Sequence, residues 1–141
     1  MLAVALTLSL LAQDVAQAPA GPLGLVDGDR DVSRWMSEPV ETSPGVHSVW
    51  WWSFFYGAGM SDGMDRAAFR YEVRCADGQL RQAHFETYAG DRLLGGHAQD
   101  QPWHTPVDRW ADPQVMARVC QGVQPTVTVD SAAAAAVHFR R

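Results

Sequence analysis

Two cysteines, Cys75 and Cys120, carry the clearest chemistry in this sequence, and the chain has no others. They lie 45 residues apart. An oxidising compartment makes and keeps disulfides, and closing a loop of this length stabilises a fold by about 4 kcal/mol. In a reducing compartment the same residues would be two inert buried thiols. We expect the disulfide, because the amino-terminal sequence described below indicates export.

Aromatic side chains gather between Val46 and Tyr56 and form a candidate binding surface or interface: Trp50, Trp51, Trp52, Phe54, Phe55 and Tyr56. In an extended strand, alternate residues point to opposite faces, so both faces of this segment would be apolar. The pattern favours a central strand that is covered on both sides. The alternative is that one aromatic face is exposed, which would suit a homodimer or a stacking surface for sugar rings.

The remaining polar residues do not form a recognisable active site. The chain has no Gly-x-Ser-x-Gly motif, and His97 and His104 lack the spacing of metal ligands. Glu72 and Glu86 could face one another, but cross-strand pairing with arginines explains them better. The glycine-rich loop at 57–65 has no phosphate-binding ending. We therefore expect a non-enzymatic protein without metal or cofactor, with a small secreted enzyme or metal protein as the alternative.

Length, composition and charge describe one ordinary folded domain. The chain has 141 residues, of which 47% are hydrophobic and 19% charged, and its formal net charge is −5. These values exclude a disordered chain. Lysine and arginine cluster only at the last two positions. A nucleic-acid partner is therefore not expected.

The first residues resemble a secretory signal. The apolar run from Leu2 to Ala12 is too short to span a bilayer, which takes about 20 residues. Small residues follow at Ala16, Ala18 and Ala20, and we expect cleavage after Ala20. The alternative is a buried amino-terminal helix. The mature protein is then expected in the periplasm, in the outer envelope or outside the cell, with no integral membrane segment.

Local patterns divide the chain into a signal peptide at 1–20, a flexible leader at 21–31, a domain at 32–122 and a carboxy-terminal tail at 123–141. Alternating and β-branched residues predict antiparallel strands at 31–38, 46–56, 68–75, 79–89 and 92–94. Asp77-Gly78 marks a hairpin turn. The fourth of these strands returns from that turn, so the pattern predicts a meander.

A short helix is expected after these strands. Asp112 is a suitable N-cap, Pro113 suits the first helical position, and Gly122 marks the end. The apolar stripe of this helix includes Cys120, and the strand alternation places Cys75 on the core side of the sheet. A disulfide would thus pin the helix to the sheet. After Ser131, an alanine-rich segment predicts one or two further helical turns.

Three short motifs now support a resemblance. They are the run from Tyr71 to Ala76, the segment Trp103-His104-Thr105-Pro106-Val107, and the helix that ends at Val119-Cys120. Together with Thr87-Tyr88 and the upstream aromatic strand, they resemble the surface-adhesin protein E family from about Trp35 to Cys120. The resemblance implies an α+β fold in which a bent antiparallel sheet is tied to a carboxy-terminal helix by a disulfide.

The family resemblance also implies a function. The named member of the family is an envelope protein of Gram-negative bacteria that binds host matrix and serum proteins and can dimerise. This chain departs from it by lacking a lipid-attachment cysteine and a matching basic host-binding segment, so no binding residue is carried over. The expected partner is another protein, or a second copy of this chain in a homodimer.

Overall fold

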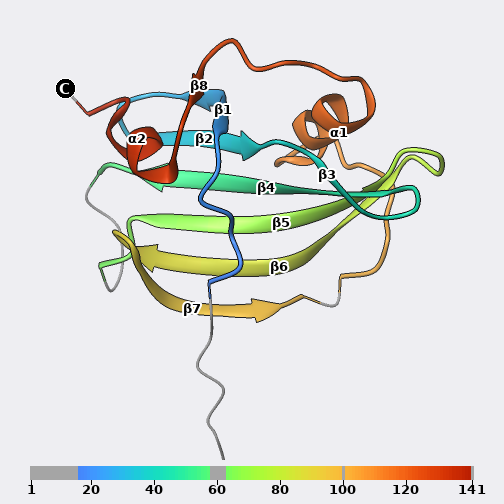
Figure 1. Cartoon of the computed structure of the whole chain (residues 1–141), viewed down its shortest axis with the longest axis horizontal. Coiled ribbons are helices and arrows are strands. Elements are labelled where there is room, and N and C mark those ends of the chain that lie inside the picture. Colours follow the sequence, from blue (N-terminus) through green and yellow to red (C-terminus); the bar gives the residue numbers. More distant parts are fainter. Residues whose placement is uncertain (1–15, 58–62, 100, 141) are drawn as a thin grey trace, which may run out of the picture.

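The computed structural model describes residues 16–57, 63–99 and 101–140. An eight-stranded sheet with antiparallel pairing forms the body of the protein, and its strands follow the order β7-β6-β5-β4-β2-β1-β8, with β3 paired to β4 (Figure 1). The strands are β1 (Leu23–Gly28), β2 (Val32–Ser37), β3 (Val40–Ser43), β4 (Val46–Phe55), β5 (Arg66–Arg74), β6 (Gln79–Ala89), β7 (Arg92–Ala98) and β8 (Thr128–Val129). Two short helices, α1 (Asp112–Cys120) and α2 (Ala132–Val137), complete the α+β fold.

The aromatic strand β4 lies at the centre of the sheet, where it pairs with β2, β3 and β5. Its alternate residues enter two separate apolar clusters. Trp50, Trp52 and Phe54 belong to the cluster that α2 covers, and Trp51 belongs to the cluster under α1. The expectation of a central strand is confirmed, but its cover is incomplete, because part of the α1 side is open.

The hairpin and meander expectations are confirmed from β4 to β7. Strand β6 begins at Gln79 and ends at Ala89 as predicted, and Gly78 in the preceding turn has a φ of 65°. Strand β7 is longer than the three residues predicted and continues to Ala98. Its glycines, Gly95 and Gly96, still pair with Thr87 and Glu86 of β6. The loop at 57–65 lies largely outside the described residues.

The disulfide between Cys75 and Cys120 is present, with 5.5 Å between their Cα atoms. Both cysteines are exposed, however, and the expectation that they lie on buried faces is wrong. Cys75 follows the last residue of β5, and Cys120 is the last residue of α1. Helix α1 buries Val115, which packs in the apolar cluster, and Arg118, whose guanidinium donates to Glu38 at 2.7 Å. The bridge therefore fastens the end of α1 at the molecular surface.

The capping of α1 also differs from the expectation. The N-cap is Ala111, which makes no side-chain hydrogen bond, and Asp112 is the first helical residue. Gly122 ends the helix with a φ of 66°, as predicted. The Asp112 carboxylate binds the preceding loop, as shown below.

Both segments that flank the predicted domain belong to the sheet. The expected flexible leader contains β1, in which Leu23 is 1% exposed. The expected tail contains β8, where Val129 pairs with Leu23, and α2, where the hydroxyl of Ser131 accepts from the amide of Ala134. One folded unit therefore extends beyond the boundaries predicted at 32 and 122.

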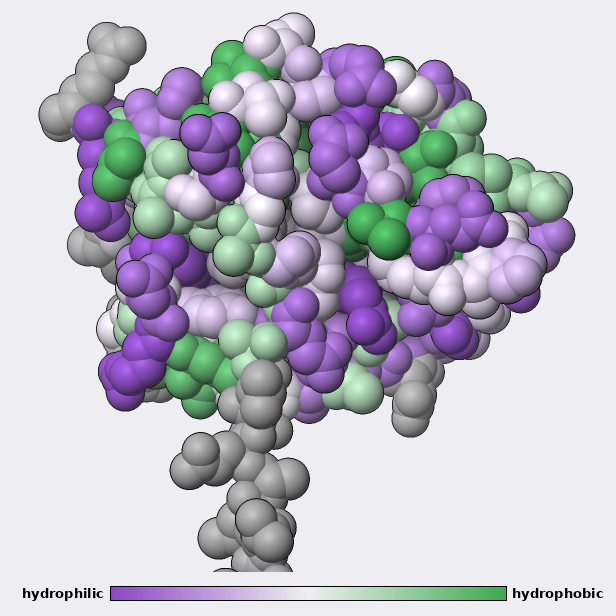
Figure 2. All heavy atoms as spheres, in the orientation of Figure 1, coloured by the Kyte–Doolittle hydropathy of each residue, from purple (hydrophilic) through white to green (hydrophobic). Residues whose placement is uncertain are grey.

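The amino-terminal segment, residues 16–22, crosses the sheet on the side of α2 before the chain enters β1 (Figure 1). Ala18 packs against the same cluster as Ala135 and Ala136 of α2. Figure 2 shows the molecule from the side that this segment crosses. Polar side chains cover most of that face, and hydrophobic residues are scattered among them. The apolar cluster on this face is therefore covered, although hollows lined by Tyr56 and Phe139 and by Gln17 and Trp50 remain at its surface.

Candidate binding hollow on the α1 side

Helix α1 is too short to cover its face of the sheet. Its nine residues span about 14 Å, whereas the ten residues of β4 span about 33 Å. The covered end of this face holds Val49, Val73, Leu80 and Val115, which are all 0% exposed. Beyond α1 the same face is open, and side chains of five strands line an uncovered hollow.

The hollow has a volume of about 540 Å³. It lies between the uncovered part of the sheet and the turn that leads into α1. Its walls are formed by Asp27, Val32, Arg34, Trp51, Ser53, Phe55, Phe69, Tyr71, Gln82, Trp110, Ala111 and Gln114. This size and this mixture of aromatic and polar side chains are typical of ligand-binding surfaces.

Aromatic side chains form the floor of the hollow. Trp51 is buried there, while Phe55 and Phe69 are half-buried. The ring of Phe69 lies 5.0 Å from that of Phe85, which in turn lies 5.3 Å from the ring of His97. A row of aromatic rings thus extends from the centre of the sheet to its β7 edge. Such a row can contact apolar or planar groups of a bound molecule.

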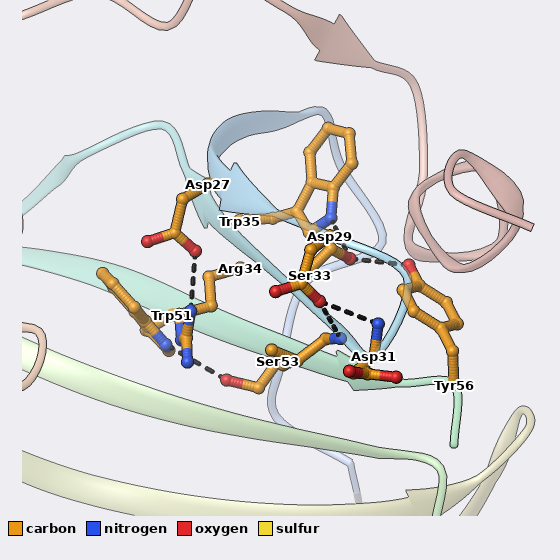
Figure 3. A network of polar contacts seen from close by, with 10 residues as sticks. Asp27, Asp29, Asp31, Ser33, Arg34, Trp35, Trp51, Ser53 and Tyr56 are labelled. Carbon is orange, nitrogen blue, oxygen red and sulfur yellow. Dashed lines mark hydrogen bonds and ion pairs between the residues drawn. The ribbon is translucent and has the colours of Figure 1, made fainter.

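Two hydrogen-bonded pairs add polar groups to one side of the hollow (Figure 3). The guanidinium of Arg34 donates to the carboxylate of Asp27 at 2.8 Å, and both side chains are partly exposed. The indole N–H of Trp51 donates to the hydroxyl of Ser53 at 3.2 Å. Because both side chains are partly exposed, Asp27 or Arg34 can bind a polar group of a ligand in place of its present partner.

A third polar pair lies opposite the first two. The Gln82 amide nitrogen donates to the hydroxyl of Tyr71 at 2.8 Å. Burial raises the pKa of Tyr71, and the Asp112 carboxylate raises it further, against the opposing effect of the Gln82 hydrogen bond. A phenol is neutral near pH 7 even without this shift, so the Tyr71 hydroxyl can act as a hydrogen-bond donor or acceptor.

Trp110 stands at the mouth of the hollow and combines two unfavourable features. Its side chain is 81% exposed, although burying a large apolar side chain is worth on the order of 2–3 kcal/mol. Its φ is 62°, in the left-handed region that non-glycine residues rarely adopt and that costs about 1–3 kcal/mol. It is the only non-glycine residue with positive φ in the described ranges. Strain of this kind is concentrated at functional sites.

The loop that carries Trp110 is held in place at both ends. The buried Asp112 carboxylate accepts from the amide of Val107 at 3.1 Å and is 3.0 Å from His104 Nε2. The backbone of His104 pairs with Leu80 in β6 through two hydrogen bonds of 3.0 Å. The turn is thereby fixed to the sheet, and Trp110 is presented by a preorganised loop.

The titratable side chains near the hollow pair with or pack against other side chains of the fold. The geometry of the hollow itself supports binding. The His104–Asp112 pair anchors the loop, as just described. His97 packs on Phe85, and Glu72 pairs with Arg81 at 3.0 Å as expected. Within the described ranges, no group of three or more His, Cys, Asp or Glu side chains is arranged to hold a metal.

The predicted site residues divide between the two faces. Only Trp51 and Phe55 line the hollow. Trp50, Trp52 and Phe54 lie on the α2 side, where each is at most 7% exposed. The hydroxyl of Tyr56 shares a hydrogen bond of 2.6 Å with Ser33. A homodimer that uses this strand stays a prediction, but its contacts would be confined to the few side chains that are not buried.

Trp110 was not among the site residues predicted from the sequence. A signal was present, because Trp110 is a large apolar residue in a polar turn between Pro106 and Pro113. The positive φ of Trp110 and the contacts of Asp112 that anchor its turn are not visible in local sequence patterns.

Among the described residues, no helix is long and apolar enough to cross a membrane. No protein-family model, curated protein or solved structure matches the chain. The geometry of the hollow is therefore the basis for its functional interpretation.

Proposed function

We propose that this chain is an exported, non-enzymatic binding protein of the bacterial cell envelope or surface, related to the surface-adhesin protein E family. We further propose that it binds another protein through the α1-side hollow, with Trp110 as the anchor. The single observation that carries the proposal is the exposed, strained Trp110 beside an aromatic floor.

The composition of the hollow supports a protein partner. Tryptophan is enriched among the few interface residues that dominate binding energy, and such residues are surrounded by polar groups that exclude water. Trp110 has this setting, with Arg34, Gln82 and Gln114 around it. The hollow is wide and open, so it can accept a protruding segment of a partner.

The disulfide supports export. Both cysteines are exposed, so the reducing agents of a reducing compartment could reach the disulfide directly. Disulfides persist in the periplasm and outside the cell and are rare in the cytosol. The apolar run from Leu2 to Ala12 lies outside the described residues, and its role as a signal stays a prediction.

The test compares three proteins in a binding assay: the oxidised domain, Trp110→Ala, and the control Val137→Ala, which changes an exposed apolar residue on α2. Each is immobilised and exposed to purified matrix proteins and to an envelope extract. We expect the unmodified domain and the control to retain the same partner, and Trp110→Ala to lose at least about tenfold in affinity. Absence of any partner above background would contradict the proposal.

A further inference from the structure

A buried carboxylate lies on the opposite side of the sheet from the hollow. His84, Glu86 and Tyr88 alternate along β6 and point to the α2 side, where all three are buried. Glu86 is 0% exposed. The sequence interpretation paired it with an arginine, but its carboxylate accepts from the hydroxyl of Tyr88 and lies 3.1 Å from His84 Nε2.

The remaining partners of Glu86 come from the amino-terminal segment. The backbone amide of Gln17 donates to one carboxylate oxygen at 2.6 Å, and that of Ala18 donates to the other at 3.3 Å. These residues are 69 and 68 positions away in the sequence. Ala18 also packs against the apolar cluster. Glu86 thus joins the segment to the middle of β6.

The neighbouring strand closes the other side of this carboxylate. A Cβ atom at Gly96 in β7 would lie 3.0 Å from Cγ of Glu86, so a side chain there would crowd the carboxyl group. Burying a carboxylate is costly unless hydrogen-bond donors surround it. Two of the four donor groups around Glu86 belong to the segment at 17–18. The site is therefore complete only when that segment is bound.

We propose that Glu86 is a binding site for backbone amides of the chain's own amino-terminal segment, and that Gln17 to Ala20 form a strap of the mature domain. Any leader is then removed before Gln17 rather than after Ala20. Cleavage after Ala18 or Ala20 would remove both amide donors and leave the buried carboxylate partly unsatisfied. The part of the proposal that concerns processing rests on the proposed export.

The first test determines the amino terminus of the mature protein. The full chain is produced with its own leader in a Gram-negative host, and the exported product is analysed by amino-terminal sequencing and intact mass. We expect the mature protein to begin at Gln17 or upstream. A mature protein that begins at Ala18 or later would overturn the assignment.

The second test uses the full chain and does not depend on export or on partner binding. Gln17→Pro removes the amide hydrogen that donates to Glu86, and Glu86→Gln removes the charged acceptor. Ala20→Pro is the matched control, because Ala20 is exposed and its amide donates to no other described residue. We expect the first two variants to melt about 5 °C lower and the control to be unchanged.

Equal melting temperatures for Gln17→Pro and Ala20→Pro would overturn the strap. Gln17→Pro is also assayed for partner binding, where we expect no change, because Gln17 and Trp110 lie on opposite sides of the sheet. Failure of the strap and failure of the binding hollow are thereby distinguished by different variants and different measurements.

Discussion

The two faces of the sheet are built from the same aromatic strand but end in different states. On the α2 side, Trp35 and Phe54 are almost completely buried, and α2 and the amino-terminal segment pack over them. On the α1 side, one short helix covers one end, and Trp51 and Phe55 line the open hollow at the other. The α2 side thus contributes more of the buried aromatic packing, and the α1 side keeps the hollow that we propose as a binding surface.

The adjacent phenylalanines Phe54 and Phe55 give the largest contrast between the faces. Phe54→Ala leaves a cavity in the closed cluster and should lower the free energy of unfolding by about 3–5 kcal/mol. Phe55→Ala removes a half-buried ring from the hollow and should cost about 1 kcal/mol. Urea denaturation of both variants measures the difference. Equal costs would show that the two faces are packed alike.

Removal of the disulfide should loosen the α1 side selectively. The double variant Cys75→Ala, Cys120→Ala should lose about 2–4 kcal/mol of unfolding free energy, because the crosslink restricts the unfolded chain. Hydrogen exchange should show the greatest loss of protection in α1, while β1 and β2 remain protected. A loss confined to the α2 side would contradict the proposed division between the faces.

Substitution of Trp110 by glycine should separate stability from binding. Glycine adopts positive φ readily, and the exposed indole contributes little packing, so Trp110→Gly should raise the free energy of unfolding by about 1 kcal/mol. The same variant should lose the partner. Thermal melts and binding curves measure the two effects. A variant that is less stable than the unmodified protein would show that the indole has a structural role.

Alkaline titration compares one tyrosine from each face and has the smallest expected effect on stability. Burial raises the pKa of Tyr71 on the α1 side; on the α2 side burial raises that of Tyr88, and Glu86 raises it further. The folded state therefore favours both neutral phenols. Their contribution to the free energy of unfolding is fully present below about pH 10, the pKa of an unfolded tyrosine. It is lost as pH rises from there through the folded pKa.

Ultraviolet titration of Tyr71→Phe and Tyr88→Phe assigns the two ionisations. Each variant should lose a step above pH 10, with the step of Tyr88 at the higher pH. Each should also lose less stability than the unmodified protein as pH rises above about 10, where an unfolded tyrosine ionises. Loss of a step at the ordinary tyrosine pKa in either variant would contradict the burial of that phenol.

Local sequence patterns were sufficient for the strands β4 to β6 and for the cysteine pair. They failed for β1, whose glycines suggested a flexible leader. A Cβ atom at Gly24 would lie 2.5 Å from Pro125, and one at Gly28 would lie 2.6 Å from Phe139. These glycines allow close packing of segments about 100 residues apart, which no local pattern records. The amide donors of Glu86 lie 69 and 68 positions away in the sequence and were missed for the same reason.

The most direct test of the account measures affinity and stability together on Trp110→Gly and on the control Val137→Ala. Surface plasmon resonance with the captured partner should show at least about a tenfold loss of affinity for Trp110→Gly and none for the control, while the melting temperature of Trp110→Gly is equal to or above that of the unmodified protein. Equal affinity of all three proteins would contradict a binding site at the hollow.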